Sequence, residues 1–64
     1  MTNEQLKVAK VGDTFTPMHG SYPCVMVVSM VRHSRAGTVY LLAEFDRSHQ
    51  RFFHPSEIAS HQSH

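Results

Sequence analysis

A chain of 64 residues with one cysteine and a net charge of +1 has room for one small domain and cannot form an internal disulfide. A domain of this size buries only about 60% of the surface of its unfolded chain, so we expect a thin core that association would help to stabilise. So small a charge does not by itself indicate a nucleic-acid partner. The N-terminus lacks a signal-peptide pattern, and no apolar run approaches the roughly 18–20 residues that span a bilayer, so we expect a cytoplasmic protein without membrane contact.

Residues 1–10 are polar with isolated aliphatic side chains, and we expect them to form a flexible or pairing N-terminal arm. Thr2 and Gln5 have the spacing of a helix capping box, but the pattern that follows is too short for a stable helix. A single β domain is expected over residues 11–58. Its first elements are a Gly-Asp turn, a short strand with Phe15 pointing inward, and a loop over residues 18–23.

The longest apolar run, Cys24–His33, predicts the central strand of the fold, because its four valines suit a pleated surface better than a helix. Both faces of this strand are mostly apolar, so both should be covered. Strict alternation gives the two faces as Val25, Val27, Ser29 and Val31 on one side, and Cys24, Met26, Val28, Met30 and Arg32 on the other.

The second half of the chain predicts a meander. A hairpin connection over residues 34–37, with a glycine available for a positive φ, precedes a strand over Thr38–Phe45. A turn over residues 46–49 leads to a short aromatic strand, Gln50–His54, and Pro55 then opens a single 3₁₀ or α turn. Residues 59–64 have little to bury and are expected to form a frayed polar tail.

This order of elements resembles small SH3-like barrels, in which a Gly-Asp turn, a short strand, a long loop, three meander strands, a 3₁₀ turn and a last short strand follow one another. The likeness rests on Val11-Gly12-Asp13, on the hairpin of the two long strands, and on residues 53–58. It implies an all-β fold, either a small SH3-like barrel or a strongly bent antiparallel sheet of four or five strands. Because SH3-like barrels include peptide binders, nucleic-acid binders and assembly modules, the resemblance does not fix a function.

The apolar side chains favour a non-enzymatic protein-interaction module that forms homo-oligomers and binds another protein. Phe52 and Phe53 are adjacent, so they must point to opposite faces of a strand, and one of them falls outside the core. Large apolar surfaces mark interaction sites. We therefore expect Ile58 and Val27 in the core, and the predicted contact residues are Met26, Met30, Phe52 and Phe53.

The alternative is a nucleic-acid-binding barrel that uses basic hairpin tips, because arginines near aromatic rings suit phosphate contact and base stacking. The residues predicted to contact phosphates are Arg32, His33, Arg35, Arg47 and Arg51. Consecutive hairpins of a meander turn at opposite ends, so the two basic groups need not form one surface.

No catalytic residue, metal site or cofactor is predicted. The six histidines lack a convincing zinc-ligand spacing, and we expect them to face solvent. Cys24 opens an apolar run, and a buried cysteine behaves as a small hydrophobic side chain rather than as a nucleophile.

Overall fold

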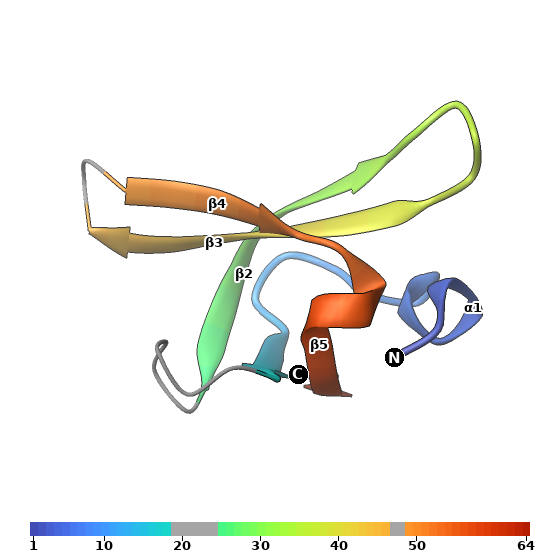
Figure 1. Ribbon diagram of the computed structural model, residues 1–64. Coiled ribbons are helices and arrows are strands. Elements are labelled where there is room, and N and C mark those ends of the chain that lie inside the picture. Colours follow the sequence, from blue (N-terminus) through green and yellow to red (C-terminus); the bar gives the residue numbers. More distant parts are fainter. Residues whose placement is uncertain (19–24, 47–48) are drawn as a thin grey trace.

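The computed structural model describes residues 1–18, 25–46 and 49–64, with the backbone alone at 45 and 46. Five antiparallel strands form one sheet in the order β4-β3-β2-β1-β5 (Figure 1). The elements are a helical turn α1 (Asn3–Leu6), strands β1 (Thr14–Pro17), β2 (Met26–His33), β3 (Val39–Asp46) and β4 (His49–Phe53), a 3₁₀ turn η1 (Pro55–Glu57), and strand β5 (Ile58–Gln62).

The sheet is strongly bent and does not close into a barrel, which confirms the all-β prediction in its bent-sheet form. Strand β2 is the element along which it bends. Its first residues pair with β1, and its later residues pair with β3. The order of turn, strands and 3₁₀ turn is the one that the resemblance implied, while β4 and β5 remain the two edges of the sheet.

The β2–β3 hairpin closes as its sequence predicts. Gly37 has a φ of 83°, which a residue with a side chain rarely adopts, and its N–H donates to the carbonyl of Ser34 over 3.0 Å. The Ser34 N–H donates to the Thr38 carbonyl, and the Thr38 N–H donates to the Ser34 hydroxyl over 3.1 Å. These bonds satisfy the polar groups of the turn, and the turn forms the tip of the hairpin at which the basic residues His33 and Arg35 lie.

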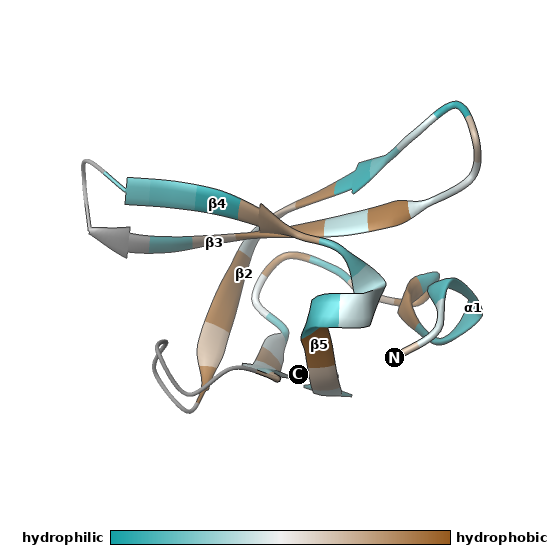
Figure 2. Cartoon of the chain, in the orientation of Figure 1, coloured by the Kyte–Doolittle hydropathy of each residue, from teal (hydrophilic) through white to brown (hydrophobic). Residues whose placement is uncertain are grey.

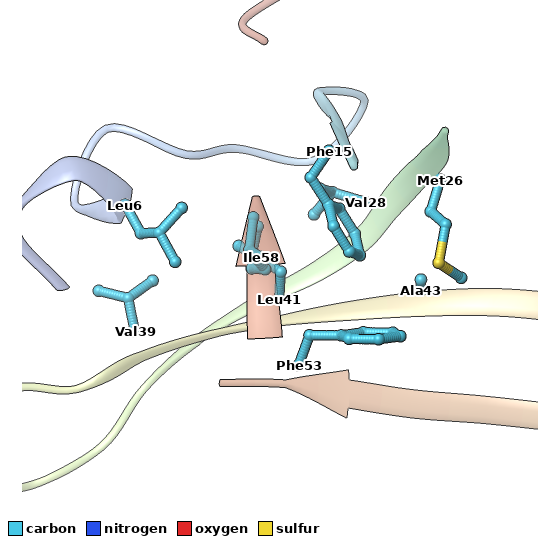
Figure 3. Close-up of a cluster of buried hydrophobic side chains, with 9 residues drawn as sticks. All are labelled: Leu6, Phe15, Met26, Val28, Val39, Leu41, Ala43, Phe53 and Ile58. Carbon is cyan, nitrogen blue, oxygen red and sulfur yellow. The ribbon is translucent and has the colours of Figure 1, made fainter. Parts of the chain in front are cut away.

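The core lies between the β2–β3–β4 hairpins on one side and α1, β1 and β5 on the other (Figure 3). Phe15 and Phe53 meet edge to face at its centre, with ring centroids 5.1 Å apart. Ile58 is fully buried as predicted, but the prediction that Val27 belongs to the core is wrong, since Val27 is 59% exposed. The core side chains are Leu6, Phe15, Met26, Val28, Val39, Leu41, Ala43, Phe53 and Ile58.

The N-terminal segment is docked rather than loose. Thr2 and Gln5 form the capping box that their spacing suggested, and the resulting turn, α1, places Leu6 in the core with no exposed surface. The Asn3 side chain binds the β2–β3 hairpin, accepting from the Val39 N–H and donating to the Gly37 carbonyl, both over 2.6 Å. The Met1 amino group donates to the carbonyls of Pro55 and Ile58.

The expectation of a frayed polar tail is also wrong, because residues from Ile58 to Gln62 form β5 and pair with β1. The register places Phe15 opposite His61 and Thr14 opposite Gln62. Local sequence concealed this strand, since its partner lies more than forty residues earlier in the chain and supplies the pairing. Among the described residues, no helix is long and apolar enough to cross a membrane.

Candidate functional site

A β-bulge in β2 decides which side chains reach the outer face of the sheet, the face turned away from the core. Val28 pairs with Ala43 and Met30 pairs with Leu42, so two steps along β2 match one step along β3. The extra residue is Ser29, whose hydroxyl donates to the Leu42 carbonyl over 3.2 Å. One inserted residue reverses the alternation of all that follow.

The bulge corrects the faces expected from strict alternation. Met26, Val28, Met30 and Arg32 were expected on one face. Met26 and Val28 do point into the core, but Met30 and Arg32 point outward, on the same face as Val27. Val31 packs instead against the core. The apolar surface expected on both sides of this strand is therefore real, but on the outer side it is left uncovered, with Val25, Val27 and Met30 about half exposed.

The predicted contact residues separate into two groups. Met26 and Phe53 are core residues, exposed by 5% and 1%, so in this fold they are not available to a partner. Met30 is 49% exposed and Phe52 is partly exposed, and both lie on the outer face. They flank Leu42, which pairs with both of them and is only 7% exposed although it lies outside the core cluster. The outer face thus carries a small apolar cluster of its own.

A pocket of about 350 Å³ lies beside this cluster, at the hairpin end of the outer face. Arg32 and Tyr40 are directly paired across β2 and β3, and the Arg32 guanidinium carbon lies 5.7 Å from the centroid of the Phe52 ring. The lining residues are Arg32, Ser34, Tyr40 and Phe52, from three successive strands and the turn between the first two. Two aromatic rings, a cation and a hydroxyl therefore converge on one hollow.

His54 extends the aromatic surface beyond Tyr40. Its ring meets the Tyr40 ring edge to face, with centroids 5.6 Å apart. The Ser56 N–H donates to Nδ1 of His54 over 3.1 Å, which caps the 3₁₀ turn η1. Because Nδ1 accepts this bond, the hydrogen of the neutral ring is on Nε2. His54 therefore has a donor left for a ligand.

The predicted basic residues that the structure describes do not form one surface. Arg32 lines the pocket, and His33 and Arg35 are exposed at the end of β2 and on the hairpin turn. Arg51 lies on the side of β4 that faces away from the pocket, with its guanidinium carbon 4.5 Å from the centroid of the Phe53 ring. There the guanidinium group forms an ion pair with the Glu57 carboxylate. That bond holds the pKa of the Glu57 carboxyl below its usual value. Arg47, like Cys24, lies outside the described residues.

A buried pair of Asp13 and His61 was missed by the sequence analysis. Asp13 has no exposed surface, and its carboxylate lies 2.8 Å from Nε2 of His61, whose side chain is 5% exposed. The His64 N–H donates to this carboxylate and is the main reason why the pKa of Asp13 is lowered from 3.8 to about 2. Bonds from His61 and from the Lys10 N–H act in the same direction, against the effect of burial.

The pair corrects the expectation that all six histidines face solvent. It fastens the C-terminal strand to the turn before β1, and only the pairing of β5 with β1 could have revealed it. In the parts of the chain that the structure describes, no three histidine, cysteine, aspartate or glutamate side chains gather into a group that could hold a metal ion. Comparisons with protein-family models, with curated proteins and with solved structures find no match to this chain.

Proposed function

We propose that this protein is a small non-enzymatic interaction module that binds a second copy of itself through an apolar row on the outer face of β2. The observation that carries the proposal is the exposure of Val25, which directly precedes β2, and of Val27 and Met30 on β2, which are 56%, 59% and 49% exposed. Figure 2 shows apolar residues along the lower part of β2, in contrast to the polar start of β4. Uncovered apolar rows of this kind mark interaction sites.

A second copy is the occupant that the charge pattern favours. In a two-fold dimer the same patch meets itself, so a charged group near the two-fold axis would face its own like charge. The apolar row contains no charged residue, and its neighbours on the sheet include the neutral Thr14, opposite Val27, and Ser29 at the bulge. The charged residues of the outer face, Glu44 on β3 and Arg32 beyond Met30, lie outside the row. The row therefore meets its own copy without repulsion.

The size of the molecule sets the expected strength of the dimer. A stable interface covers about 800 Å² on each partner, which is about a fifth of the 4215 Å² surface of this chain. Three half-exposed side chains fall short of that area, so neighbouring polar surface must take part. We expect a reversible dimer whose population depends on concentration.

The buried Asp13–His61 pair supports a non-enzymatic role. A carboxylate and a histidine at 2.8 Å are the parts of a general base, but both are enclosed, and the Asp13 oxygens already accept backbone N–H groups from Lys10 and His64. A substrate has no access to side chains with 0% and 5% exposure. The pair is suited to holding strands together.

Sedimentation velocity over a range of protein concentrations tests the proposal. The wild-type protein should shift from monomer toward dimer as its concentration rises, and Val27→Asp should remain monomeric, because the dimer would then bury two carboxylates. Val8→Asp is the matched control, since Val8 is 71% exposed but lies between α1 and β1. A wild-type protein that is monomeric at every concentration would contradict the proposal, as would an equal effect of the two variants. Circular dichroism verifies that both variants are folded.

A further inference from the structure

The hollow at the hairpin end of the outer face has the chemistry of a site for one base of a nucleic acid. Tyr40 and Phe52 supply two aromatic rings from neighbouring strands, and Arg32 and Ser34 supply a cation and a hydroxyl. The rings of Tyr40 and Phe52 offer apolar surface for stacking, which accepts every base because every base has a π face. Arginine and serine suit the phosphate and sugar that flank it.

The charges around the pocket favour an anionic ligand. His33 and Arg35 follow Arg32 on the exposed hairpin end, and the four lining residues include no acid. On the outer face of β3, Glu44 lies four residues from Tyr40, a separation of about 13 Å along a strand. It is two residues beyond Leu42, which pairs with Phe52, so it lies on the Phe52 side of the pocket and away from Arg32. Glu57 is paired with Arg51 on the other side of β4. The pocket end of the face is thus basic, although the whole chain is nearly neutral.

The same geometry disfavours a cationic peptide. An aromatic pocket can hold a lysine or arginine side chain over its rings, but Arg32 already lies over Phe52 and would repel a second cation. An acidic peptide would satisfy Arg32 and leave the rings of Tyr40 and Phe52 unused. A ligand that combines a flat ring with an adjacent phosphate uses both kinds of group.

We propose that the pocket formed by Arg32, Ser34, Tyr40 and Phe52 binds single-stranded nucleic acid, with one base stacked on the aromatic rings and the adjoining phosphates beside Arg32 and Arg35. The strand must be single, because a duplex hides the faces of its bases in the stack. The Nε2–H of His54, beside Tyr40, is a further donor for the backbone of the strand. This function goes beyond self-association and uses a different part of the outer face.

Fluorescence anisotropy of labelled oligonucleotides tests the inference. The probes are a short oligothymidylate, the matching oligouridylate, an abasic strand of the same length and a duplex, each at low and at physiological salt. The two intact single strands separate DNA from RNA as the source of the ligand. The abasic strand carries the same phosphates without bases, so it should bind about tenfold more weakly or worse if a base is stacked in the pocket. Affinity should also fall with salt, because phosphate contacts release counterions.

Variants assign the binding to the pocket. Phe52→Leu keeps an apolar side chain but removes the ring, so it should weaken binding of the intact strand about tenfold and leave the abasic strand unaffected. Phe52→Tyr keeps the ring and should retain the affinity. Arg32→Gln should weaken binding more than Lys10→Gln, which removes one exposed charge outside the outer face.

Three results would overturn the inference. The first is no binding of any single strand at low salt. The second is equal binding of intact and abasic strands, which would mean that charge alone attracts them. The third is equal affinity of Phe52→Leu and wild type for the intact strand. Sedimentation of Phe52→Leu keeps this test apart from self-association: a wild-type distribution of monomer and dimer with lost nucleic-acid binding supports two separate sites, and loss of the dimer instead would assign the pocket to the second copy.

Discussion

The two faces of the sheet differ in what their side chains are free to do. On the inner face, the side chains of the core cluster are apolar and at most 5% exposed, and those of β2, β3 and β4 pack against those of α1, β1 and β5. On the outer face, apolar side chains are half exposed and share the surface with Arg32, Tyr40 and Phe52. The inner face accounts for stability, and the outer face is available for recognition.

Adjacent residues 52 and 53 offer the sharpest test of this difference, since they place two phenylalanines on opposite faces of one strand. Phe53→Ala should cost about 3–5 kcal/mol of unfolding free energy, because it removes a side chain that is 1% exposed and in contact with Phe15. Phe52→Ala should cost about 1 kcal/mol, since its partly exposed ring loses less buried surface. Urea unfolding followed by circular dichroism measures both.

A loss of several kcal/mol is enough to unfold a domain of this size. If Phe53→Ala does not fold, Phe53→Leu and Phe52→Leu provide a milder version of the same comparison. Equal costs at the two positions would show that the outer face is covered as well as the inner one.

The Asp13 carboxylate gives a second, pH-dependent contrast, because it is the charged group enclosed on the inner side. Its pKa in the folded protein is about 2 and the ordinary value is 3.8, so the stability that it contributes is complete above pH 3.8 and is lost as the pH falls toward 2. In that window the unfolded chain binds the extra proton, and the unfolding constant should rise by up to about tenfold per pH unit.

Urea unfolding of Asp13→Asn at several pH values measures this effect. The variant should be less stable at neutral pH, because an amide cannot accept all the bonds from Lys10, His61 and His64, and its stability should fall less steeply below pH 4. Glu57, whose pKa Arg51 also lowers, contributes in the same direction in both proteins, so their difference isolates Asp13. Parallel pH profiles would mean that Asp13 is not the group responsible.

The three meander strands β2, β3 and β4 could be predicted from sequence, because each depends on a local pattern. Valine-rich and aromatic runs gave the strands, and Gly37 gave the hairpin turn. The faces of β2 could not be derived in the same way. Ser29 is an ordinary residue for a strand, and it becomes a bulge only because its partner strand runs one residue shorter between the pairs Val28–Ala43 and Met30–Leu42.

The same limit explains the misplacement of both ends of the chain. Residues 58–62 are too polar to indicate a strand, and they become one by pairing with β1 and by the bond of His61 to Asp13. The candidate site was predicted less completely than the fold. Arg32 and Phe52 were predicted as contact residues of two different partners, a nucleic acid and a protein. They come from different strands, and their meeting with Tyr40 depends on the bulge and on register.

An effect smaller than the loss of Phe53 concerns the support of the β2–β3 hairpin by α1. Asn3→Ala removes two hydrogen bonds, to Gly37 and Val39, and should cost about 1–2 kcal/mol of unfolding free energy. Hydrogen exchange measured by NMR should show faster exchange of the Val39 amide, whose acceptor is lost. Gln5→Ala is the control, because it disturbs the cap of the same helix without touching the hairpin. If Gln5→Ala loosened Val39 to the same extent, α1 would stabilise the hairpin through its packing as a whole. If only Asn3→Ala did so, a single side chain would hold the basic, aromatic end of the sheet in the position that presents Ser34 and Arg32 to a ligand.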